Sequence, residues 1–210
     1  MIRILVADDH AIVRQGLKQI VADTPDLVVT GEAERGREVV EKVSKDDYDV
    51  VLLDITMPDK TGLEVLEELK RIKPDLPVLI LSMHPEDQYA IRAIRAGASG
   101  YVTKAGVPDE LVRAIRKVSV GNKYISSSLA EKLAVYLETG AEKPLHQVLS
   151  DREYRVMCLI ASGKTVKEIA EELFLSVKTV STYRSRVLQK MKMKNNAQLT
   201  HYCVQNQLVP

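Results

Sequence analysis

The sequence predicts a doubly wound α/β domain followed by a smaller all-α domain. Over the first 120 residues, short continuous apolar runs alternate with segments of helical spacing, and this alternation gives way to helical patterns alone after about residue 145. Continuous rather than alternating apolar runs are typical of strands covered on both faces, and strand–helix alternation is typical of a parallel sheet between two helix layers. A chain of 210 residues has room for one such domain and a second, smaller one.

Five apolar runs are the expected strands of the parallel sheet. They are Ile2–Ala7, Leu27–Gly31, Val50–Leu53, Val78–Leu81 and Tyr101–Val102. Apolar residues at i, i+3, i+4 spacing predict amphipathic helices around Leu17, Leu66 and Ile91. Pro108 fits the first turn of a further helix that runs to about Val118.

The C-terminal region carries successive helix-start patterns. Ser150 and Thr165 each precede a glutamate by three residues, which is the spacing of a capping box, and Gly163 is expected to close the first of these helices. Ser176 is expected to cap a third helix. A helix, a short break and another helix have the spacing of a helix-turn-helix.

These patterns divide the chain into three parts. We expect an α/β domain over residues 1–120, a linker over residues 121–144 with one helix at Leu129–Glu138, and a helical domain over residues 145–210. Residues 1–120 hold 17 Lys/Arg and 21 Asp/Glu, a net charge of −4, whereas residues 145–210 hold 10 and 5, a net charge of +5. The basic second domain therefore predicts a polyanionic partner.

The third helix of the second domain has an apolar and a polar face. The side chains expected to face the core are those of Val177, Val180, Val187 and Met191. The opposite face carries Lys178, Ser181, Thr182 and Ser185. Six basic residues and no acid lie between residues 176 and 194, which suits contacts with DNA phosphates.

No apolar run approaches the roughly 18 residues that a membrane helix needs. The start of the sequence has neither a basic leader nor a small-residue cleavage site. We therefore expect a cytoplasmic protein with no membrane attachment.

Polar side chains follow the expected strands. Asp8 and Asp9 follow the first, Asp54 the third, Ser82 the fourth, and Lys104 comes soon after the fifth. Because ligands of doubly wound sheets bind beyond the carboxyl ends of the strands, these side chains are expected to share one rim. Three close carboxylates repel one another unless a cation intervenes, and oxygen ligands favour Mg²⁺. The central Asp54 is the expected nucleophile toward a phosphoryl group, with the metal and Lys104 neutralising charge on the transferred oxygens.

Residues 1–120 resemble the receiver domains of two-component response regulators. The resemblance lies in VADDH at 6–10, LLDITMPDKTG at 52–62, LS at 81–82 and GYVTKA at 100–105. It implies a flavodoxin-like, five-stranded sheet of order 2-1-3-4-5, in which Asp54 accepts a phosphoryl group from a sensor histidine kinase. The Mg²⁺ ligands that it implies are Asp9, Asp54, the backbone carbonyl of Thr56 and, through water, Asp8.

The same resemblance implies that Ser82 and Lys104 hold the phosphoryl group and that Tyr101 rotates on activation. Met83, directly after Ser82, is larger than the residue often found there. Two interpretations of Met83 stay open: its bulk screens the phosphoryl group from water and lengthens its lifetime, or it covers apolar surface at the loop.

Residues 149–208 resemble the LuxR-type (NarL/FixJ) DNA-binding domain, in the segment Leu149–Met191 and a final helix at Ala197–Leu208. The resemblance implies dimerisation partly through that last helix. Implied base contacts come from Ser181, Thr182 and Ser185, and implied phosphate contacts from Lys178, Thr179, Arg184 and Arg186. Many members carry a lysine at the position of Ser181 and a histidine at that of Tyr183, so the DNA sequence recognised cannot be inferred from relatives.

The expected function is that of a phosphorylation-switched transcription regulator, a homodimer on double-stranded DNA when active, with no enzymatic activity beyond its own phosphoryl acceptance and loss. An aspartyl phosphatase is the main alternative, but such enzymes normally place a second Asp where Thr56 stands. A second alternative keeps the receiver and makes the C-terminal domain a protein-binding module.

Overall fold

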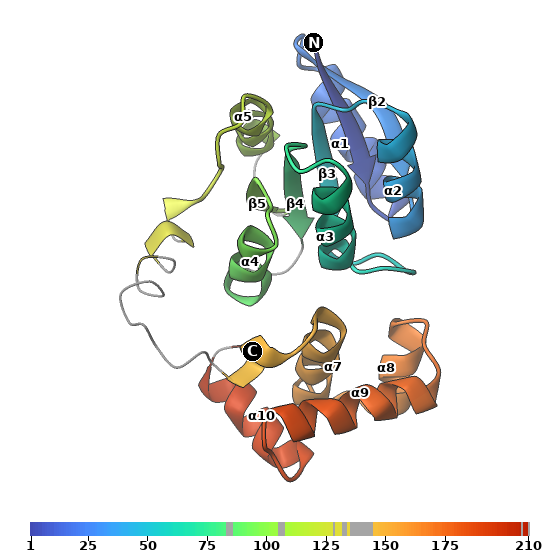
Figure 1. Ribbon diagram of the computed structural model, residues 1–210, viewed down its shortest axis with the longest axis vertical. Coiled ribbons are helices and arrows are strands. Elements are labelled where there is room, and N and C mark those ends of the chain that lie inside the picture. Colours follow the sequence, from blue (N-terminus) through green and yellow to red (C-terminus); the bar gives the residue numbers. More distant parts are fainter. Residues whose placement is uncertain are drawn as a thin grey trace. The chain divides into compact units, whose positions relative to one another are not determined.

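The computed structural model describes residues 1–82, 86–104, 108–127, 129–131, 134, 145–206 and 208–209 (Figure 1). The chain divides into two compact units, residues 1–135 and residues 136–210. Met83 lies outside the described residues, as does most of the expected linker helix; its residues 129–131 and 134 are helical.

A five-stranded parallel sheet forms the centre of the first unit (Figure 1). Its strands are β1 (Ile2–Ala7), β2 (Leu27–Ala33), β3 (Val50–Asp54), β4 (Val78–Ser82) and β5 (Gly100–Thr103). The strand order is β2-β1-β3-β4-β5, so the doubly wound fold and the order 2-1-3-4-5 are confirmed. β2 and β5 extend beyond the apolar runs because the strand pairing continues, with Ala7 opposite Ala33 and Ser82 opposite Thr103.

Helices cover both faces of the sheet. They are α1 (Ala11–Ala22), α2 (Gly36–Lys45), α3 (Gly62–Ile72), α4 (Glu86–Arg95) and α5 (Pro108–Ser119). α1 and α5 pack against the face that carries Leu52 and Leu79. Because successive side chains of a strand point to opposite faces, Leu53 and Ile80 face the layer of α2, α3 and α4 (Figure 1). Burial on both faces explains why the strand sequences are continuously apolar.

The chain after α5 returns to the sheet. Tyr124 forms a parallel bridge with Gly100, and its backbone N–H donates to the carbonyl of Ser99 at 2.8 Å. The Tyr124 hydroxyl donates to Glu110 of α5 at 3.0 Å. The beginning of the expected linker is therefore packed against the first unit.

The second unit is helical. Its elements are the 3₁₀ helix η1 (Leu145–Val148), α7 (Asp151–Ala161), α8 (Val166–Glu172), α9 (Val177–Lys190) and α10 (Asn196–Gln205). α9 packs against α7 and α8, and α10 packs against α7. Ser150 and Thr165 both form capping boxes, as predicted, and the hydroxyl of Ser176 accepts the N–H of Thr179 at 3.0 Å. Gly163, with φ +87°, closes α7 in the left-handed region that favours glycine.

The expected buried stripe of α9 is correct for Val180, Val187 and Met191, which are at most 1% exposed. It is wrong for Val177, which is 51% exposed. Side chains of a helix lean toward its N-terminus, so the first residue of α9 points past the end of the helix and away from the core. Among the described residues, no helix has the length and apolarity needed to cross a membrane.

Candidate functional site

The strand order brings acidic residues and a lysine into one pocket at the carboxyl ends of the strands. Asp8 follows β1 and is 1% exposed, and Asp54 ends β3 and is 3% exposed. The Nζ atom of Lys104, directly after β5, lies 2.6 Å from Oδ2 of Asp8 and 3.1 Å from Oδ1 of Asp54. One buried ammonium group therefore faces two buried carboxylates.

Ser82 lies on β4, the neighbour of the strand that carries Asp54, and Tyr101 lies on β5, one strand further out. Ser82 ends β4 and is 1% exposed, and its backbone carbonyl accepts the N–H of Lys104 at 2.8 Å. Tyr101 is fully buried in β5. The side chains expected to respond to a phosphoryl group are thus both buried, on the two strands that follow β3 in the sheet.

The pocket disfavours the charge on Asp54. Burial raises the pKa of Asp54 to about 6; Lys104 opposes this rise, and the neighbouring carboxylate of Asp8 adds to it. A pKa of about 6 still leaves Asp54 mostly ionised at neutral pH, as a nucleophile must be.

The loop from β3 to α3, which contains Thr56, is fixed at both ends. The N–H of Gly62 donates to the carbonyl of Ile55 at 2.8 Å, and a Cβ atom at Gly62 would lie only 2.2 Å from the carbonyl oxygen of Asp54. Asp59 accepts the N–H groups of Gly36 at 2.7 Å and Arg37 at 3.0 Å. The carbonyl of Thr56 therefore belongs to a tightly turned segment anchored to α2.

Burial alone would raise the pKa of Asp59, but hydrogen bonds from the backbone N–H groups of Arg37, Gly36 and Lys60 outweigh it and lower the pKa. Asp59 therefore stays ionised, and its charge strengthens the bonds that hold the loop.

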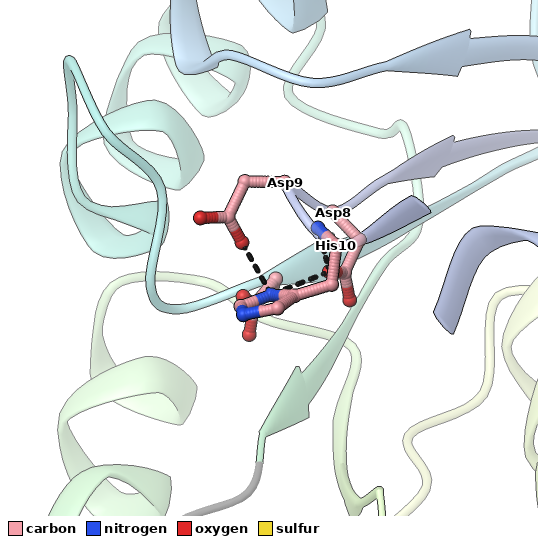
Figure 2. A group of neighbouring side chains, drawn as sticks. Asp8, Asp9 and His10 are labelled. Carbon is pink, nitrogen blue, oxygen red and sulfur yellow. Dashed lines mark hydrogen bonds and ion pairs between the residues drawn. The ribbon is translucent and has the colours of Figure 1, made fainter. Parts of the chain in front are cut away.

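Figure 2 shows the neighbouring side chains of Asp8, Asp9 and His10, which follow β1. Nδ1 of His10 lies 2.7 Å from Oδ1 of Asp9 and 3.3 Å from Oδ1 of Asp8. Ligand atoms of these three residues and Asp54 all lie within 4.8 Å of one another. Oδ1 of Asp9 is buried and accepts no hydrogen bond from the described residues. Three carboxylates whose oxygens lie this close together fit a divalent cation such as Mg²⁺.

Sequence reasoning missed two residues of this site, His10 and Arg14. Arg14 is 8% exposed, and its guanidinium donates to the backbone carbonyl of Asp8 at 2.8 Å. It shares a helix face with Leu17 and Val21, and this spacing was a sign that its side chain lies against the core. The observation that could have indicated His10 as a site residue was its position directly after two aspartates.

In the second unit, α9 presents a basic and hydroxylic surface. The exposed residues on it include Lys178, Ser181, Thr182, Ser185 and Arg186, and Thr179 is half-buried. The hydroxyl of Thr182 donates to the carbonyl of Lys178 at 2.9 Å, and that of Ser185 to the carbonyl of Ser181 at 3.0 Å. These side chains therefore lie along the surface of α9.

Two of the basic residues of α9 have partners inside the unit. Arg184 is half-buried, and its Nε donates to the side-chain oxygen of Asn196 at 2.7 Å. Nζ of Lys190 lies 2.6 Å from Oε2 of Glu153, which is 3% exposed. Arg184 and Lys190 thus help to pack α9 against α10 and α7.

A parallel sheet with a lysine-bearing acidic pocket, joined to a helix-turn-helix unit, defines a regulator with a receiver domain and a DNA-binding domain. The family model of the response regulator receiver domain matches residues 4–116, and that of the bacterial regulatory proteins of the luxR family matches residues 147–203. The chain belongs to the NarL/FixJ family of two-component response regulators.

Relatives match over nearly the whole chain. Response regulator UvrY of Escherichia coli K12 is 37% identical over 209 residues, which are 99% of this chain and 96% of UvrY. Response regulator GacA of Pseudomonas viridiflava is 38% identical over 210 residues, 100% of this chain and 98% of GacA. The structure of RcsB from Salmonella enterica serovar Typhimurium, bound to promoter rprA with the phosphomimetic BeF₃⁻, matches with a TM-score of 0.63 and 26% identity, over 96% of this chain and 97% of RcsB.

The protein is therefore a response regulator that controls transcription through a LuxR-type DNA-binding domain. Response regulators are phosphorylated by histidine kinases, and their receiver domains use Mg²⁺ at the acidic pocket. The family consists of regulators rather than classical enzymes, which sets the phosphatase alternative aside. The luxR-family match likewise sets aside a C-terminal domain that only binds protein.

Proposed function

We propose that Asp54 is phosphorylated by a sensor histidine kinase in a Mg²⁺-dependent reaction, and that phosphorylation switches dimerisation and DNA binding. The observation that carries the proposal is the 3.1 Å contact between Asp54 and Lys104 inside a buried pocket. A carboxylate that faces an ammonium group in this way is positioned to attack an anionic phosphoryl group while the charge of the transferred oxygens is compensated.

In the transfer, a carboxylate oxygen of Asp54 forms a bond to phosphorus as the bond between phosphorus and the kinase histidine breaks. Lys104 and the hydroxyl of Ser82 hold the phosphoryl oxygens. Asp9, Asp54 and the carbonyl of Thr56, with Asp8 acting through water, would hold Mg²⁺. When bound, Mg²⁺ supplies positive charge to the transferred oxygens. The carboxylate oxygens of Asp8, Asp9 and Asp54, which lie within 4.8 Å of one another, support this assignment.

Phosphorylation adds nearly two negative charges beside Lys104, which favours new positions for Ser82 and Tyr101. A population shift from 1:99 to 99:1 needs about 5.5 kcal/mol, more than the 1 to 3 kcal/mol of typical coupling energies. We therefore expect a graded shift toward the active form, reinforced by dimerisation and by DNA binding.

The active form proposed is a homodimer on double-stranded DNA. Base contacts are assigned to Ser181, Thr182 and Ser185, phosphate contacts to Lys178, Thr179, Arg184 and Arg186, and part of the dimer contact to α10. The exposure of most of these residues along α9 supports the assignment, as does the similarity to RcsB in its promoter complex. The proposal also includes the domain boundaries: a receiver domain at residues 1–120, a linker at 121–144 and a DNA-binding domain at 145–210.

The test uses beryllofluoride with Mg²⁺ as a stand-in for phosphate. Duplexes are first selected from random DNA, and affinity is measured by fluorescence anisotropy and assembly by analytical ultracentrifugation. Wild type is expected to dimerise and bind more tightly with beryllofluoride, whereas Asp54→Asn is not. Asp75→Asn, which removes an exposed carboxylate before β4, serves as the matched control and is expected to behave as wild type. An unchanged wild type, or an equal response of Asp54→Asn, would contradict the proposal.

A further inference from the structure

The turn between α8 and α9 (Figure 1) holds an exposed aromatic side chain in an unfavourable backbone conformation. Phe174 is 79% exposed, and its φ of +53° lies in the left-handed region. That region disfavours residues with a Cβ atom and favours glycine. The chain ends α7 with the same pattern of backbone hydrogen bonds, and there the left-handed residue is Gly163. Phe174 therefore lowers the stability of the fold relative to glycine, and its ring is scarcely buried.

A second exposed apolar side chain lies three residues further along the chain. Val177 is the first residue of α9 and is 51% exposed. Ser176, between the two, caps α9 with its hydroxyl. In helix-turn-helix domains, the N-terminal residues of the second helix are those that contact base edges in the major groove. Phe174 and Val177, here called the apolar pair, thus flank the end of α9 that is suited to enter a groove.

The surroundings of the apolar pair favour DNA as its partner. Lys178, directly after Val177, is exposed, and no acidic residue lies between residues 173 and 194. Such a surface suits a polyanion. Thymine presents a 5-methyl group in the major groove, and apolar side chains such as Phe contact it. Because both residues lie within the segment matched by the luxR-family model, the apolar pair continues the DNA-binding surface of α9.

We propose that Phe174 and Val177 contact the 5-methyl group of a thymine and thereby select thymine at one position of each half-site. The inference rests on the proposed function, because that function places α9 against the bases. It adds an apolar contact to the hydroxyl contacts assigned to Ser181, Thr182 and Ser185. It also explains why a bulky aromatic residue stands where the backbone conformation favours glycine.

The experiment uses the full chain with beryllofluoride and Mg²⁺, on a duplex selected from random DNA. Each thymidine is replaced in turn by deoxyuridine, which keeps the base pair and removes the methyl group alone. Wild type is expected to lose about fourfold in affinity, measured by fluorescence anisotropy, for each contacted methyl group that is removed. Phe174→Gly and Val177→Ser are expected to bind the two duplexes equally at that position. Val148→Ser, which removes a valine of η1 that is 52% exposed, serves as the matched control and is expected to keep the preference of wild type.

Phe174→Gly also separates DNA binding from folding. Glycine suits the left-handed conformation of this turn, so the variant is expected to unfold at the same urea concentration as wild type or at a higher one. A loss of thymine preference in this variant then comes from the missing ring. Unfolding at a lower urea concentration would mean that the ring stabilises the fold, and this result would contradict the inference.

Other outcomes overturn the inference as well. Equal binding of wild type to all thymidine and deoxyuridine duplexes means that no methyl group is contacted. A preference that persists in Phe174→Gly or in Val177→Ser, or that Val148→Ser also loses, means that the apolar pair does not read thymine. Transcription that is lost in Phe174→Gly while DNA binding is unchanged means that the apolar pair contacts a protein.

Lys178→Ala distinguishes failure of the inference from failure of the proposed function. If this variant binds every duplex more weakly while the thymine preference does not depend on the apolar pair, the proposed function stands and the inference fails. If it binds every duplex as tightly as wild type does, the assignment of α9 to DNA contacts fails too.

Discussion

Replacing Asp54 by Asn is expected to stabilise the metal-free protein at neutral pH. Burial raises the pKa of Asp54 from 3.8 to about 6, which means that the folded state disfavours the ionised carboxylate. Each pKa unit corresponds to about 1.36 kcal/mol, so the rise of about two units costs wild type about 3 kcal/mol above the folded-state pKa. Asn keeps the size of the side chain without its charge, and Lys104 retains its 2.6 Å contact with Asp8.

The pH dependence follows from the direction of the shift. Below pH 3.8 Asp54 is protonated in both the folded and the unfolded state, so wild type retains its full stability relative to Asp54→Asn. Wild type loses this stability as the pH rises through about 6, where Asp54 ionises in the folded state. Urea unfolding followed by circular dichroism, in the presence of a chelator and on both sides of that pKa, measures the difference, with Asp75→Asn as the control. A variant that is no more stable than wild type at neutral pH, or a difference that does not change with pH, would refute this reasoning. Added Mg²⁺ is expected to reduce the difference, because a cation that binds the folded wild type stabilises it.

Three further substitutions test the loop and the DNA-binding surface. Gly62→Ala places a Cβ atom 2.2 Å from the carbonyl oxygen of Asp54, so we expect a loss of more than about 2 kcal/mol in urea unfolding and slower phosphorylation by an acyl phosphate; unchanged values for both would contradict the account of the loop. Lys178→Ala is expected to weaken binding to all DNA sequences alike and to lower the slope of log affinity against log salt by about one. Ser185→Ala is expected to change which bases are preferred with little effect on that slope, and an altered slope with unaltered base preference would reassign Ser185 to the phosphates.

Much of the fold was predictable because its determinants are local. The strands around Leu52 and Leu79 are apolar on both faces, and a continuous run of such residues is enough to indicate a buried parallel strand. The capping boxes at Ser150 and Thr165 depend on residues three positions apart, so the sequence alone located the starts of α7 and α8. The position of Asp54 at the end of a strand was predicted from the apolar run that precedes it.

Other features depend on contacts that sequence spacing does not contain. The side chain of Val177 has the right spacing for the core but lies at the end of α9, so only the packed helices reveal its exposure. The proximity of His10 to Asp9 depends on how the chain turns after β1. The contact between Arg184 and Asn196 joins residues on two helices, and it shows that a cation assigned to DNA also has a partner within its own unit.

The return of the chain to β5 affects where a receiver fragment of this protein should end. β5 is the outer strand of the sheet, and an outer strand presents unpaired backbone groups that can pair with another molecule. Tyr124 occupies those groups at the start of β5 through its bridge to Gly100 and its bond to Ser99. A receiver fragment cut at residue 120 would uncover this edge and gain a route to strand-to-strand aggregation, whereas one that extends past Tyr124 keeps the edge covered.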